Sequence, residues 1–323
     1  MFSHLKKPVI CIVGPTATGK SNLGVEIARK LSTEVVSADS MQIYRDMDIG
    51  TAKLTQEEMK GVVHHLVDVM HPDERFSVAE WADRAYPILD TLIGRGKVPI
   101  VVGGTGLYIR AITDDLDFAR QVGNEDVRAR WEAYANTHGR HALHEALRER
   151  DPDSADRLHE NDVRRVIRAL EVFELRSVPM SEQYDWGRAG KRYQPIMIGL
   201  FRPRELLYER VNRRVDLMMR MGLYEEVRGL LARGYDEGLT SMQAIGYKEV
   251  AAAIRGEVSV EQAVDNIKRA TRRFVKRQLS WFMRDSRIVW CPQGGHFGDE
   301  PKVDEVLKTI MRISEGFPLQ ESE

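Results

Sequence analysis

Apolar runs and helical patterns alternate along much of this chain. Runs rich in apolar residues, which are typical of buried strands, occur at five places: Val9–Val13, Glu34–Ser37, Val98–Val102, Ile196–Leu200 and Arg287–Trp290. Between several of these runs, apolar residues recur about every 3.6 positions, as they do on one face of a helix. Strands that alternate with helices predict an α/β fold with a parallel sheet and helical crossover connections.

The pattern changes between Asn124 and Gln194, where the sequence is helical and charged and has no convincing strand. We interpret this part as a helical insertion domain, residues 121–194, within a core formed by residues 1–120 and 195–295. Residues 296–323 are interpreted as an acidic and polar C-terminal tail. The helical period predicts three further segments in the core and one in the tail: about Glu205–Arg233, Ser241–Arg255, Val260–Asp285 and Val303–Ile313.

Composition and charge are those of an ordinary globular protein. Of the 323 residues, 42% are hydrophobic and 30% are charged, and the formal net charge is −1, so a polyanionic partner must be met by a local basic patch. Two cysteines, Cys11 and Cys291, are too few for a disulfide framework and favour a reducing cytoplasm. The longest uncharged apolar stretch, Val98–Ile109, is too short to span a bilayer, and no signal peptide is evident. We expect a cytoplasmic protein with no membrane partner, and nothing requires more than a monomer.

A glycine-rich turn joins the first predicted strand to a predicted helix at Asn22–Leu31. Residues 14–21 (GPTATGKS) fit the pattern G-x-x-x-x-G-K-[ST] between a strand and a helix, which is the context in which this pattern binds phosphate. Backbone N–H groups would point inward, Lys20 would add a positive charge, and the Ser21 hydroxyl could hold a magnesium ion. The turn therefore predicts that a phosphorylated molecule binds at Gly14, Thr16, Ala17, Thr18, Gly19, Lys20 and Ser21.

Two other predicted strands end at the same edge of the sheet. Asp39 follows the second strand and is either a turn or capping residue, or a general base or magnesium ligand. The third strand ends in Gly103-Gly104-Thr105, where NTP-hydrolysing phosphate-loop proteins often carry a magnesium-binding aspartate. This is either an ordinary turn, or a place where a ligand approaches the backbone and the Thr105 hydroxyl donates to a phosphate oxygen. The missing acid weakens an NTPase interpretation.

Basic residues gather on the predicted helix at Val260–Asp285. One face of this helix is largely apolar and few acids offset the cations on the rest of it, which are Lys268, Arg269, Arg272, Arg273, Lys276 and Arg277. The predicted insertion adds Arg157, Arg164, Arg165 and Arg168. These residues form either a solvated surface or a surface that binds nucleic acid. On another helix, one or two cations could reach the phosphate edge, since guanidinium groups bind phosphate bidentately; these are Arg210, Arg213 and Arg214.

Several motifs in one order make the sequence similar to the bacterial-type tRNA dimethylallyltransferases, also called tRNA isopentenyltransferases. The resemblance covers nearly the whole chain up to about Trp290. Besides residues 14–21, it rests on residues 37–44 (SADSMQIY), 47–53 (MDIGTAK), 65–68 (HLVD), 103–108 (GGTGLY), 161–162 (ND), 168–172 (RALEV), 245–249 (IGYKE) and 276–281 (KRQLSW). Thr18 stands where the family commonly has serine, and the substitution keeps a hydroxyl group. Eukaryotic members carry a C-terminal zinc finger, for which this sequence has no cysteine and histidine pattern.

The resemblance implies a P-loop NTPase-like core and the transfer of a dimethylallyl group from dimethylallyl pyrophosphate to a tRNA. The acceptor would be the exocyclic amine of the adenosine just 3′ of the anticodon. Asp39 would be the general base, Thr105 and either Arg210 or Arg214 would steady the pyrophosphate, and the turn at Thr16–Ser21 would hold it with Mg²⁺. The tRNA anticodon stem-loop would be bound by Asp39, Ser40, Met41, Gln42, Thr105, Arg128, Val163, Arg164, Arg165, Val166, Ile167, Ala244, Ile245, Gly246, Tyr247, Lys248, Glu249, Lys276, Arg277, Gln278, Leu279, Ser280, Trp281, Phe282 and Met283.

Three alternatives stay open from the sequence. An isopentenyltransferase acting on free adenine nucleotides would need neither the basic helix nor the large insertion. A nucleoside-phosphate kinase or another NTPase is disfavoured by Gly103-Gly104-Thr105 at the end of the third strand. A non-catalytic RNA-binding protein would leave the phosphate-binding turn and Asp39 without a purpose.

Overall fold

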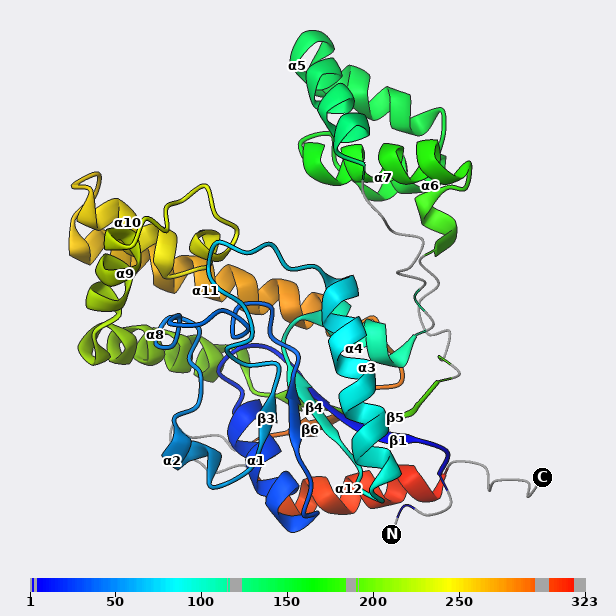
Figure 1. Cartoon of the computed structure of the whole chain (residues 1–323), viewed down its shortest axis with the longest axis vertical. Helices are drawn as coiled ribbons and strands as arrows, with labels where there is room; N and C mark the ends of the chain where they lie inside the picture. Colours follow the sequence, from blue (N-terminus) through cyan, green and yellow to red (C-terminus); the bar gives the residue numbers. More distant parts are fainter. Residues whose placement is uncertain are drawn as a thin grey trace. The chain divides into compact units, whose positions relative to one another are not determined.

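The computed structural model describes residues 2, 5–114, 116, 124–183, 190, 192–293 and 302–316. The chain divides into two compact units: unit 1 comprises residues 1–115 and 189–323, and unit 2 comprises residues 116–188 (Figure 1). Each unit has a hydrophobic core of its own. No helix in the described part of the chain is long and apolar enough to cross a membrane.

Unit 1 is built around a sheet in which each strand runs parallel to its neighbours. Across the sheet the strands lie in the order β3-β2-β4-β1-β5-β6. Their bounds are β1 (Pro8–Val13), β2 (Val35–Ser37), β3 (His64–His65), β4 (Ile100–Gly103), β5 (Gln194–Phe201) and β6 (Val289–Pro292). The predicted parallel α/β fold is therefore confirmed. The strand β3 was not predicted, because two residues are too few to make a recognisable apolar run.

One face of the sheet is covered by two helices that are far apart in the sequence. These helices are α1 (Lys20–Lys30) and α12 (Val303–Glu315), drawn in blue and red in Figure 1. Apolar residues of both helices, such as Ile27 and Ile310, share one buried cluster with residues of β1, β4 and β5. The interpretation of residues 296–323 as a separate tail is corrected accordingly. The apolar face of α12 is buried against the sheet, so this helix is part of the core.

The opposite face of the sheet carries α3 (Val78–Gly94) and α4 (Gly106–Thr113). The crossover from β3 to β4 runs across the sheet in the opposite direction to that from β1 to β2. Right-handed crossovers therefore place α3 and α1 on opposite faces. The buried Trp81 of α3 stacks on Tyr108 of α4 with ring centroids 4.7 Å apart, and its Nε1 donates to the Ser37 carbonyl oxygen at 3.0 Å. A short helix, α2 (Gln56–Met59), lies between β2 and β3 in the sequence.

A second buried cluster joins the segment after β2 to the helices that follow β5. The helices are α8 (Arg204–Met221), α9 (Leu223–Ala232), α10 (Tyr247–Ile254) and α11 (Val260–Phe282), and the 3₁₀ turn η2 (Ser241–Gln243) precedes α10. Ile43, Tyr44 and Met47 pack here against residues of these helices. This packing fixes the chain that begins with Asp39 against these four helices, of which α11 alone carries six lysines and arginines.

Two of the predicted helical segments are each divided in the structure. Glu205–Arg233 forms α8 and α9, which are separated at Gly222 with φ 103°. Ser241–Arg255 forms η2 and α10, with Gly246 at φ 103° between them. Positive φ values suit glycine; Gly222 ends α8, and Gly246 is the residue before the first turn of α10. The apolar period continues across both breaks, so periodicity alone did not reveal them.

Unit 2 contains helices and no strand among residues 124–183. Its elements are α5 (Glu125–Arg148), α6 (Pro152–Arg157), α7 (Val163–Arg176) and η1 (Met180–Gln183). The helix α5 is interrupted at Gly139, whose φ of 86° and ψ of 168° are not helical. Leu143 and Leu147 of α5 pack with Val166 and Leu170 of α7 in the core of this unit.

Candidate active site

The phosphate-binding turn predicted from residues 14–21 joins β1 to the N-terminus of α1. Gly14 has φ 137° and Gly19 has φ 98°, and Gly19 is the residue before the first turn of α1. A Cβ atom on Gly14 would lie 2.8 Å from the Leu200 carbonyl oxygen of β5, so no larger residue fits there without a backbone shift. The Thr18 hydroxyl donates to the Pro15 carbonyl oxygen at 2.8 Å and closes the turn on itself. Free N–H groups at the start of α1 favour an anion at this point.

Two arginines and one lysine donate hydrogen bonds to carbonyl oxygens of this turn. Lys20 Nζ donates to the Pro15 carbonyl oxygen at 3.1 Å, and Arg210 Nε of α8 donates to that of Ala17 at 2.9 Å. The buried Arg202 donates through Nε to the Thr18 carbonyl oxygen at 3.1 Å. Arg202 was not among the predicted site residues. Its place directly after the β5 strand, at the edge where the phosphate-binding turn lies, is the signal that could have found it.

The charges at this edge are close enough to affect one another. Burial lowers the pKa of Lys20 to about 8, and this shift is reinforced by Arg214 and opposed by the carboxylate of Asp39. Burial also lowers the pKa of Arg214, with Arg210 acting in the same direction and Asp39 against it. Both Arg210 and Arg214 therefore lie at the phosphate edge, as the sequence analysis allowed. A negatively charged ligand would relieve the repulsion among these cations.

The turns after β2 and β4 are joined by hydrogen bonds. The Ser40 N–H donates to Thr105 Oγ1 at 3.0 Å, and the Thr105 N–H donates to the Ala38 carbonyl oxygen at 3.1 Å. Asp39 Oδ1 accepts from the Met41 N–H at 2.9 Å, which orients the half-buried carboxylate. A Cβ atom on Gly103 would lie only 2.0 Å from the Ala38 carbonyl oxygen, so this close approach requires glycine. Asp39 and Thr105 are thus neighbours beside the phosphate-binding turn.

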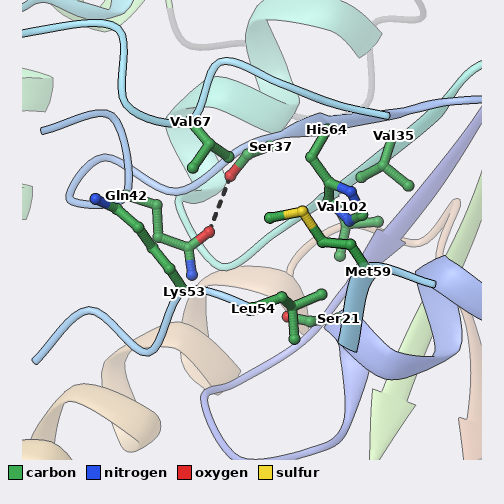
Figure 2. Close-up of a pocket in the computed structure, with 10 residues that line it drawn as sticks. All are labelled: Ser21, Val35, Ser37, Gln42, Lys53, Leu54, Met59, His64, Val67 and Val102. Carbon is green, nitrogen blue, oxygen red and sulfur yellow. Dashed lines mark hydrogen bonds between the residues drawn. The ribbon is translucent and has the colours of Figure 1, made fainter. Parts of the chain in front are cut away.

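A small pocket lies on the Ser21 side of the phosphate-binding turn (Figure 2). Apolar side chains from β2, β4 and the segment around Met59 form much of its wall, and Ser37 Oγ donates to Gln42 Oε1 at 3.2 Å on another side. His64 also lines the pocket, and burial lowers the pKa of its imidazole. The pocket is lined by Ser21, Val35, Ser37, Gln42, Lys53, Leu54, Met59, His64, Val67 and Val102.

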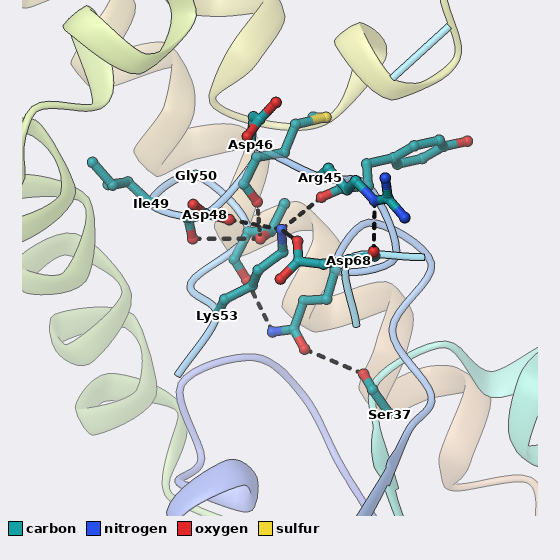
Figure 3. Close-up of polar contacts among 12 residues, drawn as sticks. Ser37, Arg45, Asp46, Asp48, Ile49, Gly50, Lys53 and Asp68 are labelled. Carbon is teal, nitrogen blue, oxygen red and sulfur yellow. Dashed lines mark hydrogen bonds and ion pairs between the residues drawn. The ribbon is translucent and has the colours of Figure 1, made fainter. Parts of the chain in front are cut away.

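Residues 47–53 are fixed by two charged side chains. Lys53, whose side chain is almost fully buried, donates to the Tyr44 carbonyl oxygen at 2.6 Å and to Asp48 Oδ1 at 2.7 Å, and also pairs with Asp68 (Figure 3). On the other side, the Glu226 carboxylate of α9 accepts from the backbone N–H groups of Asp48, Ile49 and Gly50 at 3.1, 2.8 and 3.2 Å. It also accepts from the Tyr247 hydroxyl at 2.6 Å. Residues 47–53 are therefore held by Lys53 from within the segment and by Glu226 from α9.

Substitution of Glu226 by alanine is expected to lower the free energy of unfolding by about 2–3 kcal/mol, because it leaves the half-buried N–H groups of Ile49 and Gly50 and the hydroxyl of the buried Tyr247 without their charged acceptor. The neighbouring Glu225 provides a matched control, since it is exposed and pairs only with the exposed Arg228 among the contacts described. Glu225→Ala should change the same quantity by less than about 0.5 kcal/mol. Urea unfolding of both variants measures the difference, and equal effects would contradict the role given to Glu226.

Sequence comparison places this chain among known proteins. Residues 42–285 match the model of the family described as IPP transferase, and residues 7–71 match that described as isopentenyl transferase. The chain is 46% identical over 312 residues to a tRNA dimethylallyltransferase of Thermoanaerobacter sp. (strain X514), covering 95% of this chain and 98% of that protein. It is 45% identical over 312 residues to the tRNA dimethylallyltransferase of Bacillus licheniformis, covering 96% and 98%. The chain belongs to the family of tRNA dimethylallyltransferases.

Solved structures of tRNA dimethylallyltransferases have the same fold. The full-length tRNA isopentenylpyrophosphate transferase of Bacillus halodurans aligns with a TM-score of 0.66 at 43% identity, covering 96% of this chain and 95% of that one. A eukaryotic dimethylallyltransferase acting on tRNA aligns with a TM-score of 0.79 at 25% identity, covering 98% and 82%. The resemblance inferred from the motifs is therefore confirmed, together with the P-loop-like α/β core.

In this member of the tRNA dimethylallyltransferases, the residues expected to bind tRNA fall into exposed, half-buried and buried groups. Exposed side chains are those of Lys248, Lys276, Arg277, Ser280 and Met283 in unit 1 and of Arg164 and Arg165 in unit 2. Half-buried ones are those of Ser40, Met41, Gln42, Ala244, Ile245, Glu249, Leu279 and Trp281 in unit 1 and of Arg128 and Val163 in unit 2. The buried residues are Gly246, Tyr247, Gln278 and Phe282 in unit 1 and Val166 and Ile167 in unit 2. Contact of all these residues with tRNA stays a prediction, and the buried ones belong to it because a helical segment taken as a whole includes the face that packs inward.

Several predicted cations have partners within the protein. Arg128 and Arg168 both pair with the buried Glu171, at 2.8 and 2.6 Å. In unit 1, Lys268 pairs with Asp216 at 2.5 Å, and Arg272 donates to Asn212 Oδ1 at 2.6 Å. Acids and amides of other helices thus offset part of the positive charge that α11 carries. Lys276 and Arg277 are the exposed cations of α11 that lie closest in sequence to Gln278.

Proposed function

We propose that this protein transfers a dimethylallyl group from dimethylallyl pyrophosphate to the exocyclic amine of the adenosine 3′-adjacent to a tRNA anticodon, with release of pyrophosphate. The observation that carries the proposal is the meeting of three groups at one sheet edge. These are the phosphate-binding turn, the cations Lys20, Arg210 and Arg214, and the carboxylate of Asp39. Membership in the tRNA dimethylallyltransferases and the names of its relatives support the same reaction.

In this reaction the main contribution of the protein is to stabilise the leaving group, which is pyrophosphate. In the reaction, the C1–O bond of the isoprenoid breaks, the C1–N bond to the adenine amine forms, and the amine gives up one proton. An aromatic amine is a weak nucleophile, so negative charge develops on the pyrophosphate before the new bond is complete. The amides at the start of α1 and the nearby cations stabilise that charge. Asp39 accepts the proton from the amine.

A magnesium ion fits this arrangement as a partner of the diphosphate. The described residues contain no cluster of three or more histidine, cysteine, aspartate or glutamate side chains that could hold a metal by themselves. Magnesium commonly uses few protein ligands and completes its coordination with substrate phosphates and water. The Ser21 hydroxyl at the start of α1 would hold it, and the bound ion would neutralise charge on the departing pyrophosphate.

The turn after β4 favours this reaction over NTP hydrolysis. Gly103 and Gly104 stand where many NTP-hydrolysing phosphate-loop proteins have a magnesium-binding aspartate. A transferase that only stabilises a leaving pyrophosphate has no use for an attacking water at that point. The exposed cations of α11 favour a tRNA acceptor over a free adenine nucleotide, since phosphates of the RNA backbone would be bound there.

The proposal is tested by incubating the protein with magnesium, labelled dimethylallyl pyrophosphate and unmodified tRNA, with AMP and ATP in parallel reactions. We expect label in the tRNA, poor transfer to AMP, and no consumption of ATP. Label in AMP with none in the tRNA would favour an enzyme of free adenine nucleotides. ATP consumption without transfer would favour an NTPase.

Pyrophosphate affinity is expected to fall as the pH rises above about 8. Lys20 must be protonated to attract the diphosphate, and burial lowers its pKa to about 8. Below that pH the free protein already carries the proton, so the affinity gains nothing further from Lys20. Above it, binding must take up a proton, and affinity should fall by up to about tenfold per pH unit. Titration calorimetry in buffers of different ionisation enthalpy measures both the affinity and the proton uptake. Proton uptake that is absent at pH values above 8 would contradict the assignment.

Affinity for tRNA is expected to depend steeply on salt, and the double substitution Lys276→Ala and Arg277→Ala should reduce the slope of log Kd against log salt by about 1–2. Both side chains are exposed on α11. Arg29→Ala with Lys30→Ala removes the same two charges from the far end of α1 and should leave the slope unchanged. Filter binding at several salt concentrations compares the variants. An unchanged slope in the α11 variant would make its cations part of a solvated surface.

A further inference from the structure

The side chain of Gln278 connects α11 to the phosphate-binding turn. Its Oε1 accepts from the Thr16 N–H at 2.9 Å, and its Nε2 donates to the Gly104 carbonyl oxygen at 3.0 Å. The residue is 5% exposed. One buried carboxamide thus joins the turn after β1 to the turn after β4, although 262 and 174 positions separate the partners in sequence.

The local structure is shaped to admit this carboxamide. A Cβ atom on Gly104 would lie 2.2 Å from Gln278 Nε2, and one on Gly106 would lie 1.9 Å from Trp281 Nε1. The two glycines therefore allow the last turn of α11 to lie directly on the turn after β4. At neutral pH, among side chains of this length, only an amide can accept from one backbone N–H and donate to one backbone carbonyl through its two terminal atoms, since a glutamate is then ionised and only accepts.

The hydrogen bond between Gln278 and the Thr16 N–H also divides the backbone amides of the phosphate-binding turn into one that is engaged within the protein and others that can face a ligand. The Thr16 N–H is engaged by Gln278, so it is not directed to a ligand in this conformation. The sequence analysis counted Thr16 among the residues that bind phosphate. The amides that remain for a diphosphate are those that follow, from Ala17 to Ser21, at the start of α1.

We propose that Gln278 is a positioning residue that holds the phosphate-binding turn in the shape that accepts a diphosphate, and that it does not contact tRNA. The proposal rests on the proposed function in that the turn binds the pyrophosphate group. A turn held at Thr16 loses little conformational entropy when the ligand binds, so the ligand binds more tightly. Lys276 and Arg277 directly precede Gln278 in the sequence of α11. The helix therefore exposes its cations on one side and holds the phosphate-binding turn with Gln278 on the other.

Two substitutions at this position separate positioning from other roles. Gln278→Met preserves length and approximate volume but removes both hydrogen bonds. Gln278→Glu preserves the acceptor for Thr16, removes the donor to Gly104, and places a carboxylate beside the ligand site. A matched control is Gln262→Glu, the same exchange on the same helix. Gln262 is exposed, and among the described residues its Oε1 accepts only from the Ser259 N–H at 2.9 Å, which a carboxylate does equally well.

The measurement is the Kd of inorganic pyrophosphate with magnesium, by titration calorimetry on the full chain, together with the Kd of tRNA. We expect pyrophosphate to bind about tenfold more weakly to Gln278→Met, and more weakly still to Gln278→Glu at about pH 8. The tRNA affinity of Gln278→Met and the pyrophosphate affinity of Gln262→Glu should stay within about twofold of the unmodified protein.

A change of pH gives a signature that a purely structural role would not produce. When protonated, the carboxyl group introduced by Gln278→Glu both accepts and donates, as the amide does. Its pyrophosphate affinity, taken as a ratio to that of the unmodified protein at each pH, should therefore recover between about pH 8 and pH 6. The same ratio for Gln278→Met should stay constant over this range.

Three outcomes would overturn the proposal. Unchanged pyrophosphate affinity in both variants at position 278 would show that the turn does not need the carboxamide. Loss of tRNA affinity with unchanged pyrophosphate affinity would return Gln278 to the RNA-binding residues. If the pyrophosphate affinity of Gln278→Glu, relative to that of the unmodified protein, did not recover as the pH falls, its weaker binding would be due to damaged packing. If the unmodified protein itself failed to bind pyrophosphate, the proposed function would fail first, which distinguishes the two conclusions.

Discussion

Dimethylallyl transfer is expected to fall by about 10²–10⁴-fold when Asp39 is replaced by asparagine, with little change in tRNA affinity. The asparagine oxygen can still accept from the Met41 N–H, as Asp39 Oδ1 does at 2.9 Å, so the turn after β2 should keep its shape. What the substitution removes is the group that accepts the proton of the adenine amine. Single-turnover transfer with saturating tRNA and dimethylallyl pyrophosphate measures the chemical step, and filter binding measures tRNA affinity.

Asp39→Ala provides a second test of the same residue. It removes the bond to Met41 as well as the carboxylate, so it should abolish transfer and also loosen the turn. If asparagine retained most of the activity and alanine did not, the carboxylate would serve only to shape the turn. If both variants lost tRNA affinity and turnover to the same degree, Asp39 would be structural. Either result would remove the general base from the proposed reaction.

Replacing Lys20 with methionine is expected to lower kcat/KM for dimethylallyl pyrophosphate by about 10²–10³-fold, since one charged donor to the developing pyrophosphate is lost. The effect should be large because Lys20 lies with Arg210 and Arg214 at a partly buried edge, where charge is weakly screened. The affinity for inorganic pyrophosphate should fall as well, and its decline above about pH 8 should disappear.

The same substitution at Lys30 is the control for this prediction. Lys30 is the last residue of the same helix, is exposed, and pairs with Asp304 of α12 at 2.5 Å. Lys30→Met should leave both kcat/KM and pyrophosphate affinity within about twofold of the unmodified protein. Steady-state transfer assays compare the two variants. A Lys20→Met variant that kept its pyrophosphate affinity would show that the phosphate-binding turn is not where the diphosphate is held.

Those parts of the fold that depend on short stretches of sequence could be predicted. The runs at Val9–Val13 and Ile196–Leu200 became β1 and β5, because a strand buried on both faces is apolar at nearly every position. The two-residue β3 and the breaks at Gly222 and Gly246 were missed, since none of them interrupts the apolar pattern.

The candidate site could be predicted best where its residues follow strands directly, although Arg210 and Arg214 of α8 were also expected at the phosphate edge. Asp39 and Thr105 follow β2 and β4, which are adjacent in the sheet, so their closeness could be expected from the parallel topology. Arg202, Glu226 and Gln278 reach their partners across 184, 177 and 262 positions. Such contacts depend on how helices pack, which a single sequence does not specify. The helical period of Val260–Asp285 puts Gln278 on the largely apolar face of that helix, but it does not reveal the partners of the carboxamide.

Because α12 comes late in the sequence, the parts of the newly made chain can complete their folding only in a certain order. The face of the sheet that α1 and α12 cover is completed by apolar residues of α12 such as Val306 and Ile310, so its apolar surface stays open until residues 302–316 have left the ribosome. The helices of unit 2 come from the continuous stretch 124–183 and need no later segment for their own core. Unit 2 can therefore fold during synthesis, before α12 is available to cover the sheet. Until α12 packs there, the uncovered strands are exposed to aggregation and to chaperones.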